Sequence, residues 1–254
     1  MKIYSGLTSV TFRQLTPDEI IDLAVQAGLD GIEWGGDVHV PPGDTALAEK
    51  IGERTRAAGL QVLSYGSYYR CTAEEDPAAV LAAAQALGAP NIRVWAGKTD
   101  AAEMDDCQLE DLARTLDHFA AAAEKNGMIV STEYHTRTAT STPEMTQRLL
   151  DRVLRDNFFT YFQPDNRRTD EENLLHLNRF LPRISNLHVF HWKSWTERFA
   201  LENGEAIWKK YLETFARSPR ASGACIMEFV RDDSPGQFLA DAETLRCWIR
   251  ELSR

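Results

Sequence analysis

Short runs of apolar residues alternate with longer amphipathic segments along the whole chain. The short runs predict strands near residues 3–8, 31–35, 61–66, 91–96, 128–134, 158–163, 185–190 and 224–230. The longer segments predict helices near 17–27, 45–58, 77–87, 107–126, 143–154, 170–181, 205–217 and 235–252. Strict alternation of this kind is typical of parallel strands joined by right-handed helical crossovers.

The expected helix boundaries carry recognisable capping residues. Thr16-Pro17-Asp18-Glu19 combines a capping box with proline at the first helical position. Gly28 stands where a helix C-terminal cap belongs, and Gly59, Gly88 and Gly127 each separate a helix from the following strand. These boundaries therefore predict a succession of separate β/α units.

We expect an α/β fold, a single-domain (β/α)8 TIM barrel with a parallel eight-stranded barrel, spanning residues 1–254. The length of 254 residues is typical of one such barrel, and no Pro/Ser/Gly-rich linker marks a domain boundary. An open doubly wound sheet is the alternative. Two long loops, 35–44 and 191–204, follow strands and so lie on the face where barrel enzymes build their sites.

Composition and charge exclude several classes of function. The formal net charge of −10 disfavours broad binding to nucleic acid. No apolar run reaches the roughly 20 residues that span a bilayer, and the first residues lack the pattern of a signal peptide. The cysteines are dispersed without a CxxC pair, which fits reduced thiols. We expect a cytoplasmic protein that binds neither membrane nor nucleic acid.

Four of the expected strands end in side chains that could ligate a metal. They supply Glu133, Gln163 with Asp165, His188 and Glu228. Polar groups at buried strand ends are costly unless they bind something, and consecutive barrel strands would bring these side chains together. Carboxylates with a histidine suit Mg²⁺ or Mn²⁺, and Zn²⁺ is a further option. The alternative is that each glutamate forms an interior salt bridge with a lysine or arginine.

The alternation of side chains along a strand assigns the histidines. His188 is the expected ligand, while His191 lies past the strand end as either a loop residue or a substrate contact. His135 shares a face with Glu133 and could reach the site from one layer higher. Gln163 and Asp165 also share a face, and Pro164 between them favours a strand end there.

Strands two to four and their following loops add aromatic and polar groups that suit sugar recognition. Interior packing is the alternative interpretation for each of them. The full set of expected substrate-binding residues is His39, Tyr65, Arg93, Trp95, His135, Asp165 and His191. There is no Walker loop, no GxGxxG after the first strand and no GxSxG elbow, which argues against Rossmann cofactors and serine hydrolysis.

Several stretches of the chain resemble the xylose-isomerase-like barrel superfamily. The resemblance covers the whole chain and rests on 29–33 (Leu-Asp-Gly-Ile-Glu), 87–89 (Leu-Gly-Ala), Glu133, His188 and Glu228. That superfamily contains sugar and sugar-phosphate isomerases and epimerases, inositol-pathway enzymes and endonuclease-IV-type proteins. Its members hold a divalent cation through Glu, Asp, His and Glu from strands five to eight.

The resemblance implies Glu133, His188 and Glu228 as metal ligands and leaves the fourth ligand open. Family members often carry an Asp-Pro-Gly-Asn-like sequence at strand six, where this chain has Gln163-Pro164-Asp165-Asn166. Aligning the prolines places Gln163 at the ligand position. The other interpretations are that Asp165 substitutes through a small change of register, or that the metal is weak or missing.

The implied reaction is isomerisation or epimerisation of a sugar or sugar phosphate next to its carbonyl. A divalent cation would stabilise the enediolate, and Glu133 and Glu228 would exchange protons on opposite faces of the substrate. The partner is then a small-molecule carbohydrate, and a homo-oligomer stays open. The alternatives are a lyase that dehydrates a keto-sugar or keto-inositol, a non-catalytic sugar-binding barrel, and an endonuclease-IV-type nuclease. The acidic charge and the presence of only six histidines argue against the nuclease.

Overall fold

A computed structural model describes residues 1–252 of the chain, and in these residues eight parallel strands form a closed barrel. The order around the barrel is β1-β10-β7-β6-β5-β4-β3-β2. The strands are β1 (Lys2–Thr8), β2 (Gly31–Gly35), β3 (Gln61–Gly66), β4 (Asn91–Val94), β5 (Ile129–Thr132), β6 (Phe158–Phe162), β7 (Ile184–Val189) and β10 (Ser222–Met227). The predicted barrel is therefore confirmed, and the open sheet is excluded.

A helix follows each barrel strand, close to the predicted positions. They are α1 (Pro17–Gln26), α2 (Thr45–Ala57), α3 (Pro77–Leu87), α4 (Asp106–Glu124), α5 (Pro143–Leu150), α6 (Asp170–Phe180), α7 (Glu205–Ala216) and α8 (Pro235–Glu251). Thr16 and Glu19 form the predicted capping box. No helix within residues 1–252 is both long and apolar enough to cross a bilayer.

Five of the barrel strands end one to three residues earlier than the apolar pattern predicts. β5, β6 and β10 stop at Thr132, Phe162 and Met227, so Glu133, Gln163 and Glu228 each stand one residue beyond a strand. The predicted loop 191–204 also contains a short antiparallel hairpin, β8 (Trp192–Ser194) and β9 (Glu197–Arg198). Apolar runs continue past the ladder because residues after the strand are still buried, so hydropathy alone overestimates strand length.

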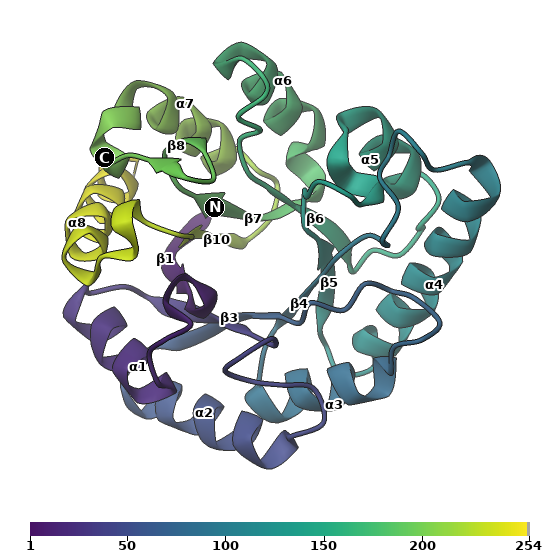
Figure 1. Ribbon diagram of the computed structural model, residues 1–254, viewed down its shortest axis with the longest axis horizontal. Helices are drawn as coiled ribbons and strands as arrows, with labels where there is room; N and C mark the ends of the chain where they lie inside the picture. The colour runs from purple at the N-terminus through teal and green to yellow at the C-terminus, as the bar shows by residue number, and fades with distance from the viewer. Residues whose placement is uncertain (253–254) are drawn as a thin grey trace. The chain divides into compact units, whose positions relative to one another are not determined.

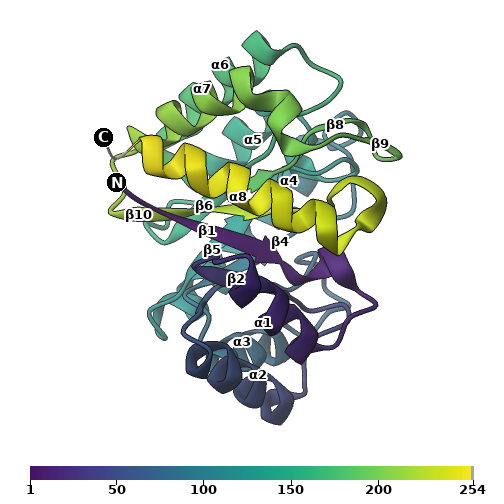
Figure 2. The same cartoon turned by 90° about the vertical axis from the view of Figure 1, so that its left-hand side faces the viewer.

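Contacts divide the chain into two compact units whose boundary falls within β2 and β6. The first unit comprises 1–33, 54–61 and the chain from Phe162 onward. Within it β1 and β7 flank β10, with Ile226 of β10 paired to His188 of β7. α8 packs against β1 and α7, and α6 packs against α7 (Figures 1 and 2).

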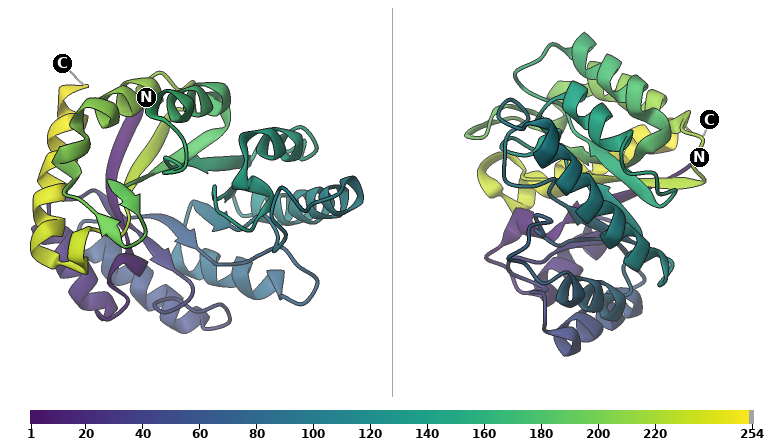
Figure 3. Two further views of the ribbon diagram at one scale, coloured as in Figure 1. Left: turned by 45° about the horizontal axis from the view of Figure 1, so that its top comes forward. Right: turned by 90° about the vertical axis from the view of Figure 1, so that its right-hand side faces the viewer.

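The second unit comprises residues 34–53 and 62–161. β4 pairs with both β3 and β5, and α3 packs beside α4 (Figure 3). α4 begins at a capping box formed by Asp105 and Gln108, and its buried stripe is Leu109, Leu112, Ala113, Leu116, Phe119, Ala120 and Ala123. Their spacing of three and four residues turns one face of the helix inward.

An uncharged polar layer lies between the strands of this second unit. The Asn91 amide nitrogen donates to the Tyr161 hydroxyl at 3.0 Å, and that hydroxyl donates to Ser64 Oγ at 2.9 Å. Ser131 Oγ donates to Asn91 Oδ1 at 2.9 Å. All four residues are buried, so each hydrogen bond replaces water that the interior excludes.

Replacing Tyr161 with phenylalanine should lower the free energy of unfolding by about 1–3 kcal/mol, because buried groups of Asn91 and Ser64 lose a partner. Tyr211→Phe is the matched control, since both side chains are 1% exposed and the Tyr211 hydroxyl has no hydrogen-bond partner among residues 1–252. Urea denaturation of both variants checks this expectation. Equal losses in the two would show that the polar layer contributes nothing specific.

Candidate metal and substrate site

The imidazole of His188 stands at the centre of a buried cluster in the first unit. Its Nε2 lies 3.4 Å from Glu33 Oε1 on β2. Its Nδ1 lies 2.9 Å from Gln163 Oε1, just after β6, and 3.4 Å from Glu228 Oε2, just after β10. Both His188 and Glu33 are 0% exposed, so water does not satisfy either ring nitrogen.

The chemistry of the neighbours decides which nitrogen of His188 carries the proton. An ionised Glu33 carboxylate can only accept a hydrogen bond, so Nε2 must donate to it. In the neutral ring, Nδ1 then presents a lone pair toward the oxygens of Gln163 and Glu228. Convergence of three acceptors is unfavourable unless a cation, a second ring proton or a rotated Gln163 amide supplies positive charge or a donor. A histidine held by a carboxylate on its far nitrogen is common among metal ligands.

Local backbone structure fixes the position of Glu228. Its backbone N–H donates to Val189 O at 3.1 Å, which continues the β10–β7 ladder by one residue. Phe229 then adopts a left-handed conformation with φ of 47°, and its N–H donates to Thr11 Oγ1 at 3.1 Å. This conformation costs a residue other than glycine about 1 kcal/mol or more. The chain thus turns sharply after Glu228 and leaves its carboxylate at the strand end.

Glu133 is held by two donors within the second unit. Its backbone N–H donates to Val94 O of β4 at 3.0 Å. Its Oε2 accepts a hydrogen bond from Trp95 Nε1 at 2.9 Å and forms an ion pair with the Arg93 guanidinium. The side chains of Arg93 and Glu133 are 2% and 5% exposed. The interior salt bridge that was the alternative interpretation for Glu133 is therefore present. It is formed by the same carboxylate that is a candidate metal ligand.

Trp95 also forms the centre of an aromatic and cationic group. The His135 ring stacks on it at 4.2 Å between centroids and an interplanar angle of 22°. The Arg70 guanidinium lies 3.8 Å from the indole centroid, and the Tyr68 ring lies 5.7 Å away. Such a surface offers a flat face together with hydrogen-bond donors.

The remaining candidates of this site occupy varied surroundings, and their substrate contacts stay predictions. Tyr65 is fully buried, its hydroxyl donates to Val40 O at 2.8 Å, and burial raises its pKa. His39 packs edge-on against Trp34 at 6.0 Å. Asp165 pairs with Arg167 at 2.8 Å and Arg168 at 3.5 Å.

His191 lies beyond the end of β7 and is half-buried. Burial lowers its pKa, and the nearby Asp170 carboxylate opposes that shift in part.

The predicted ligands Glu133, His188 and Glu228 are all buried, and they are of the types that could hold a metal ion. Gln163 Oε1 contacts His188, whereas Asp165 is engaged by its arginine neighbours.

Sequence reasoning missed two relationships around the predicted ligands. The sequence marks Glu33 as part of a motif and as one of the polar groups of strands two to four, but not as the residue that contacts His188 Nε2. Arg93 was expected to meet substrate, yet it pairs with Glu133. Both residues are ionisable and sit on buried strands, which was the signal that each needed a charged or hydrogen-bonded partner.

The chain matches a known protein family over most of its length. Residues 21–252 match the model of the xylose isomerase-like TIM barrel family. Among curated proteins, none matches the chain.

Solved structures similar to the chain share its fold at low sequence identity. The probable 3-DHS dehydratase AsbF of Bacillus anthracis is 16% identical with a TM-score of 0.79, covering 97% of this chain and 99% of its own. A xylose isomerase-like TIM barrel protein of Mycobacterium smegmatis in complex with magnesium is 14% identical with a TM-score of 0.72, covering 98% and 97%. A D-allulose 3-epimerase of Methylomonas sp. is 12% identical with a TM-score of 0.70, covering 97% and 98%.

We expect Nε2 of His188 to carry a proton, because the Glu33 carboxylate can only accept a hydrogen bond. The ¹⁵N chemical shifts of the ring nitrogens measure this directly. Glu33→Gln should remove the preference, since an amide can donate as well as accept, while the spectrum of His39 stays unchanged as the control. An unprotonated Nε2 on His188 at neutral pH would contradict the assignment.

Proposed function

The chain belongs to the xylose isomerase-like TIM barrel family, and from this premise we propose that it is a metal-dependent isomerase or epimerase of sugars or sugar phosphates. The substrate would be a small carbohydrate with a carbonyl next to a hydroxyl-bearing carbon. The family contains enzymes of this type, and the likeness to an epimerase structure is compatible with it.

The single observation that carries this proposal is the convergence of acceptors on His188 Nδ1. Gln163 Oε1 lies 2.9 Å and Glu228 Oε2 lies 3.4 Å from His188 Nδ1. Nδ1 presents a lone pair to them when the neutral ring keeps its proton on Nε2 and donates it in a hydrogen bond to Glu33. Mixed oxygen and imidazole donors of this kind fit Mn²⁺, Mg²⁺ or Zn²⁺. The residues present therefore fit a divalent cation, and Glu133 would add a further carboxylate to its donors.

When bound, the cation would supply a Lewis acid for the carbonyl and hydroxyl oxygens of the substrate. The chain's own residues would do the remaining work. Glu33 holds the His188 ring in one tautomer and orientation. Arg93 and Trp95 anchor Oε2 of Glu133, which orients the carboxylate without the entropy cost of a mobile side chain.

In the proposed reaction, Glu133 and Glu228 exchange protons with the substrate carbon. One carboxylate removes the proton next to the carbonyl and the other returns one, which inverts or moves the stereocentre. Positioned general acids and bases of this kind accelerate reactions by roughly 10²–10⁴-fold. The flat face of Trp95 with its stacked His135 would carry the apolar face of a sugar.

A second candidate function is dehydration of a keto-sugar or related keto-acid. The observation that favours it is the unequal surroundings of the two glutamates. Glu133 carries the buried Arg93 ion pair and the Trp95 hydrogen bond on one oxygen, so a reaction with a single base at Glu228 suits this geometry. The likeness to a probable dehydratase is compatible with this alternative.

Purified protein should bind close to one divalent cation, and Glu228→Gln should weaken that binding by about 10–100-fold because a charged donor becomes a neutral one. Isothermal titration with Mn²⁺ measures the affinity. Asp165→Asn is the matched control, since it makes the same change in a carboxylate that Arg167 and Arg168 already engage.

The two variants separate the alternatives at strand six. If Asp165→Asn releases the cation and Gln163→Ala does not, Asp165 is the fourth donor. Gln163→Asp should tighten binding if Gln163 is that donor, because it adds a negative charge.

Incubation with the sugar in D₂O should place deuterium on the carbon next to the carbonyl. A carboxylate that exchanges with solvent delivers the label during proton return. Glu133→Gln should lose label incorporation and turnover together, because an amide cannot cycle protons at neutral pH. Mass spectrometry and NMR of the recovered sugar read both quantities.

Three outcomes of that experiment have distinct meanings. Product formed by loss of water, with no isomer, selects the dehydratase. Bound cation with neither product nor exchange, across ketoses, aldoses and their phosphates, would argue for a sugar-binding barrel instead. Exchange retained in Glu133→Gln would remove Glu133 from the proton transfer.

A further inference from the structure

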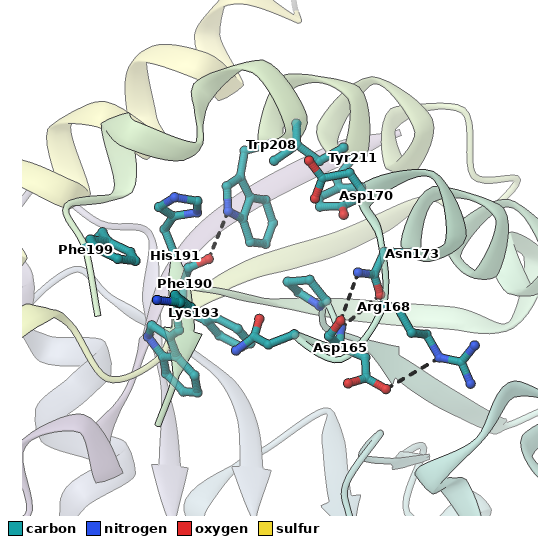
Figure 4. Close-up of a pocket in the computed structure, with 14 residues that line it drawn as sticks. Asp165, Arg168, Asp170, Asn173, Phe190, His191, Lys193, Phe199, Trp208 and Tyr211 are labelled. Carbon is teal, nitrogen blue, oxygen red and sulfur yellow. Dashed lines mark hydrogen bonds and ion pairs between the residues drawn. The ribbon is translucent and has the colours of Figure 1, made fainter. Parts of the chain in front are cut away.

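A pocket opens in the first unit beside the segments that follow Gln163 and His188, and two of its lining residues, Asp165 and His191, are predicted substrate contacts. Its cavity volume is about 350 Å³, within the range of small-molecule sites. Figure 4 shows the pocket, whose lining comes from the segments after β6 and β7 and from the starts of α6 and α7. His188, Gln163 and Glu228 are not among its lining residues.

Most charges around this pocket are already compensated. Asp165 pairs with Arg167 and Arg168, and Lys193 pairs with Glu197 at 3.1 Å. Asn173 is also engaged, since its amide exchanges hydrogen bonds with the backbone of Asp165 at 2.9 and 3.1 Å. The indole N–H of Trp208 donates to Phe190 O at 2.9 Å, as Figure 4 shows. These groups build the wall and have little capacity left for a ligand.

Three other groups of the lining lack partners within residues 1–252. The Tyr211 hydroxyl is buried without any hydrogen bond, on a side chain that is 1% exposed. The Asp170 carboxylate and the ring nitrogens of His191 make no hydrogen bond or ion pair among the described residues. A buried hydroxyl without a partner costs about 1–3 kcal/mol, which a bound ligand would recover.

Asp170 lies close enough to influence both neighbours electrostatically. Its carboxylate raises the pKa of His191 against the stronger lowering by burial, and it adds to the rise that burial causes in the pKa of Tyr211. At neutral pH the lining of the pocket therefore includes a tyrosine O–H, a neutral imidazole and a carboxylate.

We propose that this pocket is a second ligand site, and that it takes a neutral polyhydroxylated molecule the size of a monosaccharide. Asp170 needs a donor while the Tyr211 hydroxyl needs an acceptor, and a ligand hydroxyl can serve both. An anion would be repelled by Asp170, because Arg168 and Lys193 of the lining are already paired with Asp165 and Glu197 and do not offset its charge. Rings of Phe190, Trp208 and Tyr211 supply flat apolar walls for the C–H faces of a sugar.

The indole N–H signals of the tryptophans provide a direct test. The wild-type protein labelled with ¹⁵N-tryptophan is titrated with neutral hexoses and hexitols, and in parallel with choline and a hexose phosphate. Trp192 and Trp208 line the pocket, whereas Trp34 and Trp248 do not, so the first pair should shift, saturably, with a neutral probe while the second pair stays unchanged. Shifts caused by a charged probe alone would overturn the proposed ligand class, and no shift of Trp208 with any probe would overturn the site.

Two variants test the assigned groups. Tyr211→Phe removes only the hydroxyl and should weaken probe binding about tenfold without lowering the melting temperature. Asp170→Asn, at an exposed position, should weaken binding to a similar extent. Unchanged affinity in both variants would refute the assignment.

Glu228→Gln, which impairs the proposed cation site, should leave probe binding at this pocket intact. Failure of the proposed reaction and failure of this inference are therefore distinguishable. If Glu228→Gln abolishes the Trp208 shift, the probe is binding at the catalytic cluster and the second site is disproved.

Discussion

The buried imidazole of His188 sets the requirement that its surroundings must meet. An imidazole without access to water needs a partner for each nitrogen, and its two sides are not equivalent once one of them donates. Glu33 fixes the donating side, so the other side, which faces acceptor oxygens, needs a proton or a cation between its nitrogen and those oxygens. The parallel pairing of β10 with β7, and the sharp turn at Phe229, bring Glu228 to that side. The need of the buried His188 nitrogens for polar partners thereby explains why several neighbouring strand ends carry acidic or amide side chains.

The arrangement around Glu133 answers a different problem, which is the accumulation of negative charge. Glutamates concentrated in a buried region are costly unless a cation or several donors compensate them. Arg93 compensates Glu133 permanently, since both side chains are almost completely buried. Gln163 adds no further negative charge, because its side chain is a neutral amide. The chain therefore carries less net negative charge around its ligands than a full set of carboxylates would, which is compatible with a moderate affinity for a cation.

The architecture could be predicted from the sequence because several independent signals mark the same boundaries. Capping residues such as Thr16, glycines at the αβ turns and apolar runs all gave consistent boundaries, and errors at strand ends were one to three residues. The candidate ligands were also identifiable, since Glu133, His188 and Glu228 are polar residues in apolar runs. The pairing of Arg93 with Glu133 could not be predicted, because it depends on rotamers and on which of several nearby polar groups an arginine reaches. The hairpin β8–β9 was missed because its strands are too short to show a period.

Strand β4 contributes two polar side chains to the interior, Asn91 and Arg93, two residues apart. One is neutral and the other is charged, and this difference affects how the strands align. A slip of one residue against β5 would turn interior side chains outward, and hydrophobicity alone rejects it. A slip of two residues would keep every side chain on its proper face, so the apolar pattern cannot detect it. Here a slip that moves Arg93 from its register partner Ser131 to Ile129 would carry the guanidinium to the level where Asn91 now bonds Ser131 and Tyr161, and away from Glu133. The alternation of an amide and a guanidinium along one strand thus excludes the misalignment that an all-aliphatic barrel would tolerate.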